Sequence, residues 1–320
     1  MAPYTSTDLL AGVRRLGYLP DASDLSDSDL LSFADEEQVT LISGAIKLER
    51  EEHYVTSIDY ALDGVTRTYP IPVRAMGRMV RGIIYVTPTG ITYPCPEVDP
   101  VRGWLGRSQK ATAFCHSIYG DSIVLPGPGP LGWSMRVFYL RRPSRLIATT
   151  GAAAIVQATT TTSIAIVSNY SWVTSGLLMD VVKGTIPSEC SYTDLVSAAN
   201  ASSTTIALNS ATPVDPSQIA APTGTNARQD WLCPAETTVF PQVPVEFYPA
   251  LEAAVCRRAL EAIGDREGVA VVADTYAKRV QAAIDITSPR DESGGRAIVR
   301  RNSPLRSGGM WGRLRGRRWL

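Results

Sequence analysis

The stretch His53–Gly64, HYVTSIDYALDG, marks a change of structural period along the chain. From Tyr54 onward the side chains follow a repeat of two residues, which is typical of a β-strand. One face of the predicted strand comprises Tyr54, Thr56, Ile58, Tyr60 and Leu62. Asp63-Gly64 then gives the signal of a hairpin-type turn. We therefore expect helices before this stretch and β structure after it.

The residues before this stretch predict two amphipathic helices. Thr5 and Asp8 fit the cap and the third position of a first helix, and Gly17 can end it in the left-handed conformation. Apolar residues at helical spacing predict a second helix over Asp27–Glu52. An amphipathic helix needs a packing partner, so both helices are expected to bury one face.

After this stretch, residues 54–148 predict an antiparallel β domain. Runs of alternating residues are separated by Gly- and Pro-rich clusters such as residues 126–130. The further strand candidates are Met79–Thr87, Gly90–Tyr93, Ser122–Leu125 and Trp133–Leu140.

Residues 149–242 differ in composition, because Thr, Ser and Ala dominate and charges are sparse. The β-prone runs are Ala154–Ala158, Ser163–Val167, Leu177–Val182 and Thr204–Leu208. We interpret this segment as a Thr/Ser-rich β module or insertion, with partial disorder as the alternative.

Helical spacing returns near the end of the chain. It predicts one helix over Val245–Ile263 that stops at Gly264, and another over Val269–Ile286 with Pro289 just beyond it. The expected fold class is α+β. Residues 1–53 and 243–289 form a discontinuous helical bundle, the β-rich part is a large antiparallel insertion, and residues 290–320 form an extended basic arm.

The formal net charge of zero hides a strong asymmetry. Residues 290–320 hold nine arginines and two acids, a net charge of +7. Because the whole chain has 31 cations and 31 acids, residues 1–289 hold 22 cations and 29 acids, a net charge of −7. Such a division is typical of a protein with an interaction arm.

The sequence offers few groups suited to catalysis. The two histidines, His53 and His116, lie in no metal-binding spacing, and no phosphate-binding loop or nucleophile elbow is present. The acids Asp35-Glu36-Glu37 and the run Glu49–Glu52 are expected on a solvated helix face. We therefore expect a protein that is not an enzyme, with no catalytic residue, cofactor or metal.

The cysteines and the length of the apolar runs indicate the cellular compartment in which the protein is expected. Five single cysteines without a C-x-x-C pair argue against zinc and a disulfide framework, and we expect them to be buried. No signal peptide or apolar run of membrane-spanning length is evident. A soluble protein made in a cytoplasm, with no membrane partner, is the expectation.

The basic arm is the candidate partner-binding site. Arginine supplies planar bidentate donors, while Trp311 and Trp319 add aromatic surface that a merely solvated tail rarely contains. The candidate residues are Arg300, Arg301, Arg306, Trp311, Arg313, Arg315, Arg317, Arg318, Trp319 and Leu320. The tryptophans favour a groove on a protein partner, with nucleic-acid phosphates as the second choice.

Four stretches of the chain resemble the head-to-tail adaptor, or connector, proteins of tailed bacteriophages. They are Asp8–Glu52, Tyr69–Arg78 followed by Arg81–Val86, Phe138–Pro143 leading to Leu146, and Val243–Leu251. The resemblance implies a structural virion protein of the neck that forms a ring of twelve copies below the portal. It further implies an arm, here residues 290–320, that becomes ordered when it binds the portal protein. The ring would surround a channel through which DNA passes without sequence-specific binding.

Two other classes of protein fit the same sequence. A tail nozzle or fibre-attachment component would use residues 149–242 as its main interface with tail proteins. A nucleic-acid-binding protein would use the Arg-rich arm as a phosphate clamp, and its affinity would fall steeply with salt.

Overall fold

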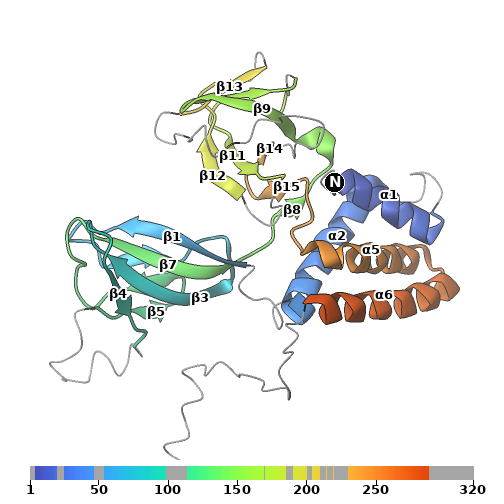
Figure 1. Cartoon of the computed structure of the whole chain (residues 1–320), viewed down its shortest axis with the longest axis horizontal. Helices are drawn as coiled ribbons and strands as arrows, with labels where there is room; N and C mark the ends of the chain where they lie inside the picture. The colour runs from blue at the N-terminus through green and yellow to red at the C-terminus, as the bar shows by residue number, and fades with distance from the viewer. Residues whose placement is uncertain are drawn as a thin grey trace, which may run out of the picture. The chain divides into compact units, whose positions relative to one another are not determined.

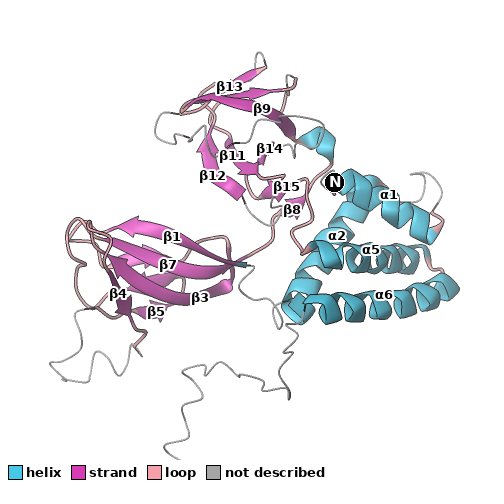
Figure 2. Cartoon of the chain, viewed as in Figure 1, coloured by secondary structure: helices cyan, strands magenta, loops and turns pink. Residues whose placement is uncertain are grey.

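The computed structural model places residues Met1–Thr287 in one compact unit. It describes residues 4–19, 25–46, 54–98, 114–168, 170–184, 190–199, 204–209, 214, 219 and 230–287. Within these ranges the chain is a mixed α+β protein whose α-helices are α1, α2, α5 and α6 and whose main sheets are antiparallel (Figures 1 and 2). The α+β class expected from the sequence is therefore confirmed.

Helix α1 spans Ser6–Gly17 and begins with the predicted capping box of Thr5 and Asp8. The left-handed residue at its end is Tyr18, with φ of 48°, and not Gly17 as predicted. Tyr18 accepts this conformation because its backbone N–H donates to the carbonyl of Arg14. The prediction of the helix was right and that of its cap was wrong by one residue.

Helix α2 spans Asp27–Leu41 and begins with a capping box of Ser26 and Asp29. It continues as a short π-helix, η1, over Ile42–Ile46. The prediction of one regular α-helix over Asp27–Glu52 is thus wrong from Ile42 onward, and residues 47–53 lie outside the described ranges. A π-helical turn gives no distinct signal in the apolar spacing, because the buried Ile42 and Ile46 are four residues apart, a spacing that also fits one face of an α-helix.

The later helices match their predictions closely. A 3-10 turn, η5, over Val245–Phe247 leads into α5, Tyr248–Ile263, which ends at Gly264 with φ of 87°, as predicted. Helix α6 spans Arg266–Thr287 and so begins three residues before the predicted Val269.

Helices from both ends of the described chain share one hydrophobic core. Helices α1 and α2 pack on α5, and α5 packs on α6. Val13, Leu30 and Leu251 are almost wholly buried in this core. The β-strand residue Leu140 also lies in it, so the core reaches the end of the nearest sheet.

The first β sheet contains β1 (Val55–Ala61), β7 (Ser134–Arg141), β3 (Ala75–Val86) and β4 (Thr92–Cys95), in that spatial order. Strand β1 pairs with the distant β7 and with no neighbour in sequence, so Asp63-Gly64 does not close a hairpin. Instead the Asp63 carboxylate accepts the backbone N–H groups of Val65 and Thr66, at 2.8 and 2.7 Å. This is a local turn held by the side chain.

A second sheet covers one face of the first. It contains β2 (Thr68–Pro70), β6 (Ser122–Val124) and β5 (Ser117–Tyr119), in that order. Tyr85, Met135 and Ile123 are buried between the two sheets. Ile58, predicted on the bulky face of β1, is 38% exposed, because β1 lies at the edge of its sheet.

The Thr/Ser-rich segment forms a six-stranded sheet with its own core. The spatial order is β12 (Cys190–Val196), β11 (Leu178–Val182), β14 (Trp231–Pro234), β9 (Ala153–Thr160), β10 (Ser163–Ile166) and β13 (Thr205–Ala207). All four predicted β-prone runs are strands of this sheet. A 3-10 turn, η3 (Thr149–Gly151), precedes it, and the short strands β8 (Arg145–Leu146) and β15 (Thr237–Thr238) pair in parallel beside it.

Candidate functional site

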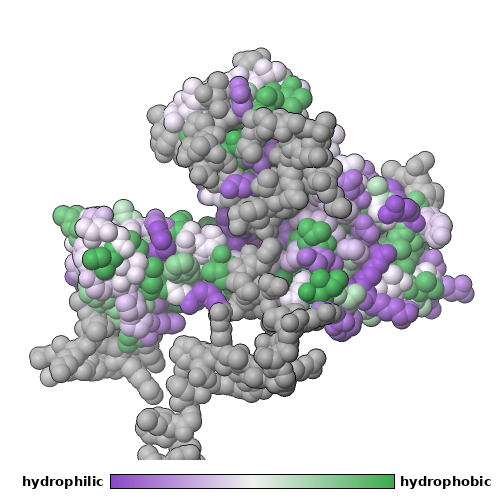
Figure 3. Space-filling view, in the orientation of Figure 1, coloured by the Kyte–Doolittle hydropathy of each residue, from purple (hydrophilic) through white to green (hydrophobic). Residues whose placement is uncertain are grey.

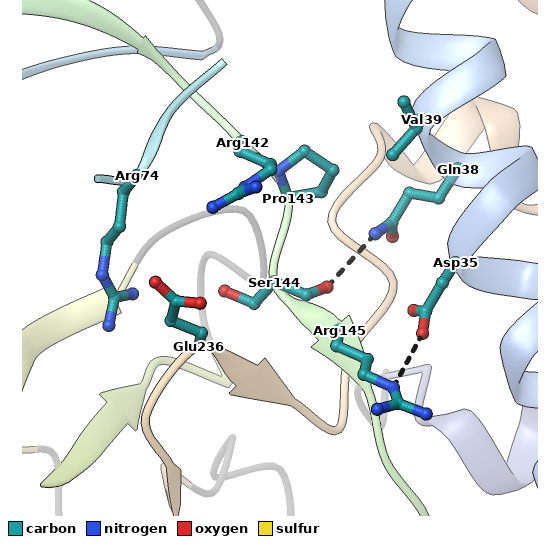
Figure 4. A pocket seen from close by; sticks show the side chains of 9 residues that line it. All are labelled: Asp35, Gln38, Val39, Arg74, Arg142, Pro143, Ser144, Arg145 and Glu236. Atoms are coloured by element: carbon teal, nitrogen blue, oxygen red, sulfur yellow. Dashed lines mark hydrogen bonds and ion pairs between the residues drawn. The ribbon is translucent and has the colours of Figure 1, made fainter. Parts of the chain in front are cut away.

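A polar pocket of about 310 Å³ lies where α2, the β domain and the Thr/Ser-rich module meet (Figure 4). Its lining residues are Asp35, Gln38, Val39, Arg74, Arg142, Pro143, Ser144, Arg145 and Glu236. They come from α2, from the loop before β3, from the link between β7 and β8, from β8 itself, and from the turn between β14 and β15. We call this region the polar junction.

Arg74 and Asp180 form the ion pair at the centre of the polar junction. Asp180 has no exposed surface, and its two carboxylate oxygens accept hydrogen bonds from Arg74 Nη2 at 2.9 and 2.8 Å. The backbone N–H groups of Asp194 and Glu236 donate to the same carboxylate, at 3.1 and 2.8 Å. The buried charge of Asp180 is thus compensated by a cation and two dipoles, which such burial requires.

The two backbone donors to Asp180 have left-handed conformations. The φ angle is 57° at Asp194 and 62° at Glu236. Such angles are uncommon outside glycine, and surrounding interactions must hold them in place. Here the Asp180 carboxylate supplies that interaction for both residues.

A second set of contacts joins α2 to the link after β7 through two buried glutamines. Gln38 Oε1 accepts the backbone N–H of Gln242 at 2.6 Å, and Gln242 Oε1 accepts the backbone N–H of Ser144 at 2.6 Å. Gln38 and Gln242 are 1% and 0% exposed. Each side chain therefore acts in place of a missing backbone partner.

Asp35 forms the third link of the junction. Its carboxylate accepts the backbone N–H of Leu146 at 2.6 Å and lies 3.5 Å from the guanidinium of Arg145. Burial raises the pKa of Asp35 to about 6. The hydrogen bond from Leu146 and the charge of Arg145 oppose this rise. Arg145 is 74% exposed at its side chain, so solvent screens most of its effect.

Glu37 is buried between helices instead of lying on a solvated face. It is 2% exposed, and its Oε1 accepts from Arg258 Nε at 2.8 Å and Arg257 Nη2 at 3.3 Å. The guanidinium of Arg257 in turn lies over the ring of Tyr276, 5.1 Å from its centroid. The expectation of a solvated acidic face is therefore wrong for Asp35 and Glu37, and it holds for Glu36, whose side chain is 57% exposed.

The charges of the separate structural parts explain why the junction is ionic. Residues 54–148 hold 11 cations and five acids, a net charge of +6. Residues 1–53 hold four cations and 11 acids, a net charge of −7. The acidic body inferred from the sum over residues 1–289 thus contains a basic β domain, whose arginines meet acids of α2 and of the Thr/Ser-rich module.

Sequence reasoning missed Arg74, Asp180, Gln38 and Gln242. One signal was present: Asp180 is the single charge in the strand run Leu177–Val182, LLMDVV. A lone acid in an apolar strand is typical of a buried, paired carboxylate. Its partner could not be named, because Arg74 lies 106 residues away.

The predicted site residues of the basic arm, from Arg300 to Leu320, all lie outside the described ranges, as does His53. His116 is 4% exposed and is not part of the pocket lining. Its Nδ1 lies 2.9 Å from the carbonyl oxygen of Cys95, and burial lowers its pKa. The structure therefore gives His116 a place in the core of the β domain.

Two features are absent from the described residues. They contain no group of three His, Cys, Asp or Glu side chains arranged to hold a metal ion. None of their helices combines the length and apolar character needed to cross a bilayer.

No protein-family model matches this chain, and no curated protein matches it.

Proposed function

We propose that this chain is a structural protein of a tailed-bacteriophage virion: the head-to-tail adaptor that forms a ring below the portal and joins it to the tail. In this proposal residues 290–320 order on the portal protein, and the Thr/Ser-rich module meets tail nozzle or fibre proteins. Twelve copies surround the channel for DNA, and the protein acts by assembly, with no catalytic step.

The observation that carries this proposal is the shared core of the helices from residues 1–53 and 243–287. It supports an arrangement in which the helices form one bundle and the β structure is inserted between α2 and α5. That arrangement is the one implied by the resemblance to adaptor proteins.

The polar junction gives further support. Three of the four stretches that resemble adaptors contribute side chains to the pocket: Asp35 and Gln38, Arg74, and Arg142. The fourth begins at Val243, next to the buried Gln242. The resemblance therefore concerns residues that come together in one structural region rather than isolated matches.

The charge distribution fits the same role. The basic arm, residues 290–320, carries a net charge of +7, which suits a partner surface rich in carboxylates. The N-terminal helices carry a net charge of −7, which suits a wall past which DNA slides, because attraction to phosphate would retard it.

Mass measurement of the full chain, alone and with the purified portal protein, tests the proposal. We expect a ring of twelve, alone or on the portal, and loss of portal binding when the chain is truncated after Pro289. Circular dichroism of the truncated chain checks that the compact unit is intact. If the truncated chain bound the portal as tightly as the full chain, the role of the arm would be wrong.

A tryptophan variant separates the protein-binding from the nucleic-acid-binding role of the arm. Replacing Trp311 and Trp319 with Ala keeps all nine arginines. If the arm docks in protein grooves, this variant loses portal binding. If the arm is a phosphate clamp, the variant keeps a DNA affinity that falls steeply with salt.

A further inference from the structure

We propose that strand β1 is a docking site for a strand of a second copy of this chain, and that this strand is Arg296–Arg301 of the basic arm. Each copy then adds one strand to the first β sheet of the next copy. The inference rests on the proposed function in one respect, because it expects the copies to form a ring. It leaves Trp311 and Trp319 for the portal protein.

Strand β1 lies at the margin of its sheet, with no strand on its outer side among the described residues (Figure 1). Its seven residues pair with β7 in an unbroken register. Just after β1, the N–H and C=O groups of Leu62 both bond to the loop before β7. Because these groups alternate along a strand, those of Ser57 and Asp59 point away from β7. The strand therefore presents a row of backbone donors and acceptors to a partner.

The other sheet edges of the described chain are short, blocked or paired. The outer strands β12 and β13 of the six-stranded sheet meet through the bridge of Ser197 with Leu208. Strand β4 has four residues and contains Pro94, β2 and β5 have three residues each, and β8 and β15 have two. Strand β1 has no proline, lysine or bulge to prevent edge pairing. Such an unprotected edge is typical of a strand that receives a partner strand.

The side chains of β1 define what an added strand must offer. Ile58 pairs with the buried Val137, yet it is 38% exposed because no strand lies on its other side. On the opposite face, the Asp59 carboxylate accepts from Arg136 at 2.7 Å, and its side chain remains 43% exposed. Figure 3 shows both apolar and polar surface along this margin of the domain. A strand with an apolar side chain beside Ile58 and a cation beside Asp59 complements both.

The basic arm contains one run with these properties. Arg296–Arg301, RAIVRR, lies between Gly294-Gly295 and Asn302-Ser303-Pro304, which is the pattern of a strand bounded by turn residues. It holds the only β-branched residues of the arm, at positions 298 and 299. Because side chains alternate along a strand, the phase that places Val299 beside Ile58 places Arg300 on the side of Asp59.

Charge and reach fit a second copy as the source of this strand. The arm has a net charge of +7 and residues 1–289 have a net charge of −7, so the arm of one copy attracts the body of the next. Residues 288–295 span at most about 30 Å when extended, a distance suited to an adjacent copy.

The geometry of a ring selects between two ways of using β1. Pairing of β1 with β1 of a second copy is two-fold and closes after two copies. A ring needs a contact between different surfaces of adjacent copies, which an exchanged strand supplies. The same strand docked on its own chain links no copies.

A photo-cross-link in the full chain, alone and with the purified portal protein, tests this inference. A benzophenone amino acid replaces Ile298, and a control version carries it at Leu305, beyond Pro304. We expect position 298 to give covalent dimers on a denaturing gel, with the link mapped by mass spectrometry to residues 55–61 of the second chain. Position 305 should give no link to those residues.

Proline variants show whether backbone pairing makes the contact. Ser57→Pro removes an outward N–H from β1, and the matched control Ser57→Ala keeps it. The yield of covalent dimer from position 298 should fall at least about tenfold in Ser57→Pro and stay unchanged in Ser57→Ala. Val299→Pro should lower the yield as strongly, and it lies outside the compact unit Met1–Thr287, so it leaves that fold intact. Circular dichroism of each variant checks the fold.

Several outcomes would overturn strand exchange. They are a link within one chain, a link that avoids residues 55–61, and an unchanged dimer yield in Val299→Pro.

A benzophenone at position 311 scores portal binding separately. If position 298 links to β1 of a second copy while position 311 fails to reach the portal, the adaptor proposal fails and strand exchange stands. If position 311 reaches the portal while position 298 gives no link to β1, the adaptor proposal stands and strand exchange fails.

Discussion

Arg74 and Asp180, which lie 106 residues apart, are joined by two hydrogen bonds of 2.9 and 2.8 Å to a carboxylate without any exposed surface. Arg74 precedes the strand β3 of the β domain, and Asp180 lies within β11 of the Thr/Ser-rich module. One ion pair therefore fixes the end of one β sheet against another.

Replacing Arg74 with Ala should destabilise the protein by about 3–5 kcal/mol, because Asp180 would remain buried without its cation. The exposed pair of Arg78 and Asp121, whose side chains are 57% and 68% exposed, gives a matched control. Arg78→Ala should cost less than about 1 kcal/mol. Chemical denaturation of the three proteins measures the difference, and equal losses for both variants would contradict it.

Asp35 should make stability depend on pH between its two pKa values. Because its pKa rises from 3.8 to about 6 on folding, its favourable contribution is complete below pH 3.8 and is lost as the pH rises through 6. Asp35→Asn should therefore match the unchanged chain in unfolding midpoint near pH 4 and exceed it above pH 6. The exposed control Glu36→Gln should show no such divergence, and parallel curves for Asp35→Asn would contradict the prediction.

Gly264 should resist substitution, since it ends α5 with φ of 87°. Gly264→Ala should cost about 1–2 kcal/mol, the penalty for a side chain in the left-handed region. Gly44 in η1 has ample space around it, because no atom lies within 4 Å of the position that an added methyl group would occupy. Gly44→Ala should change the free energy of unfolding by less than about 1 kcal/mol, in the stabilising direction. Chemical denaturation measures both variants, and an equal loss of stability in the two would contradict the prediction.

The cysteines should react slowly with thiol reagents in the native protein. Cys95, Cys115, Cys233 and Cys256 are buried. Burial raises the pKa of Cys95 to about 12 and that of Cys256 to about 11, so neither forms thiolate at pH 8. Titration with Ellman's reagent should show at most one fast thiol before denaturation, and all five after it. Two or more fast thiols would show that the core opens readily.

Local signals predicted much of the fold correctly. Two helix ends were predictable because they depend on neighbouring residues alone. They are the capping box of Thr5 and Asp8 and the stop at Gly264. The strands of the Thr/Ser-rich segment were also predictable, because β-branched runs between turn residues need no distant information.

The strand partners and the burial of charged side chains could not be predicted from the sequence. The pairing of Val55 with Leu140 depends on which strands meet in space, and alternation along β1 cannot specify it. Asp35 and Glu37 looked solvated because helical spacing identifies one buried face. Helix α2 instead contacts α1, α5 and β8, and residues of β8 and α5 bind Asp35 and Glu37.

The packing of α1 and α2 on α5 also affects the order of events on the ribosome. Roughly 200 residues separate Leu41 from Tyr248, which at about 5–20 residues per second means an interval of about 10–40 s before α5 emerges. During that interval both β parts can fold, while the apolar faces of α1 and α2 stay uncovered. Nascent chains should therefore depend on a chaperone that shields the amino-terminal helices until synthesis is nearly finished.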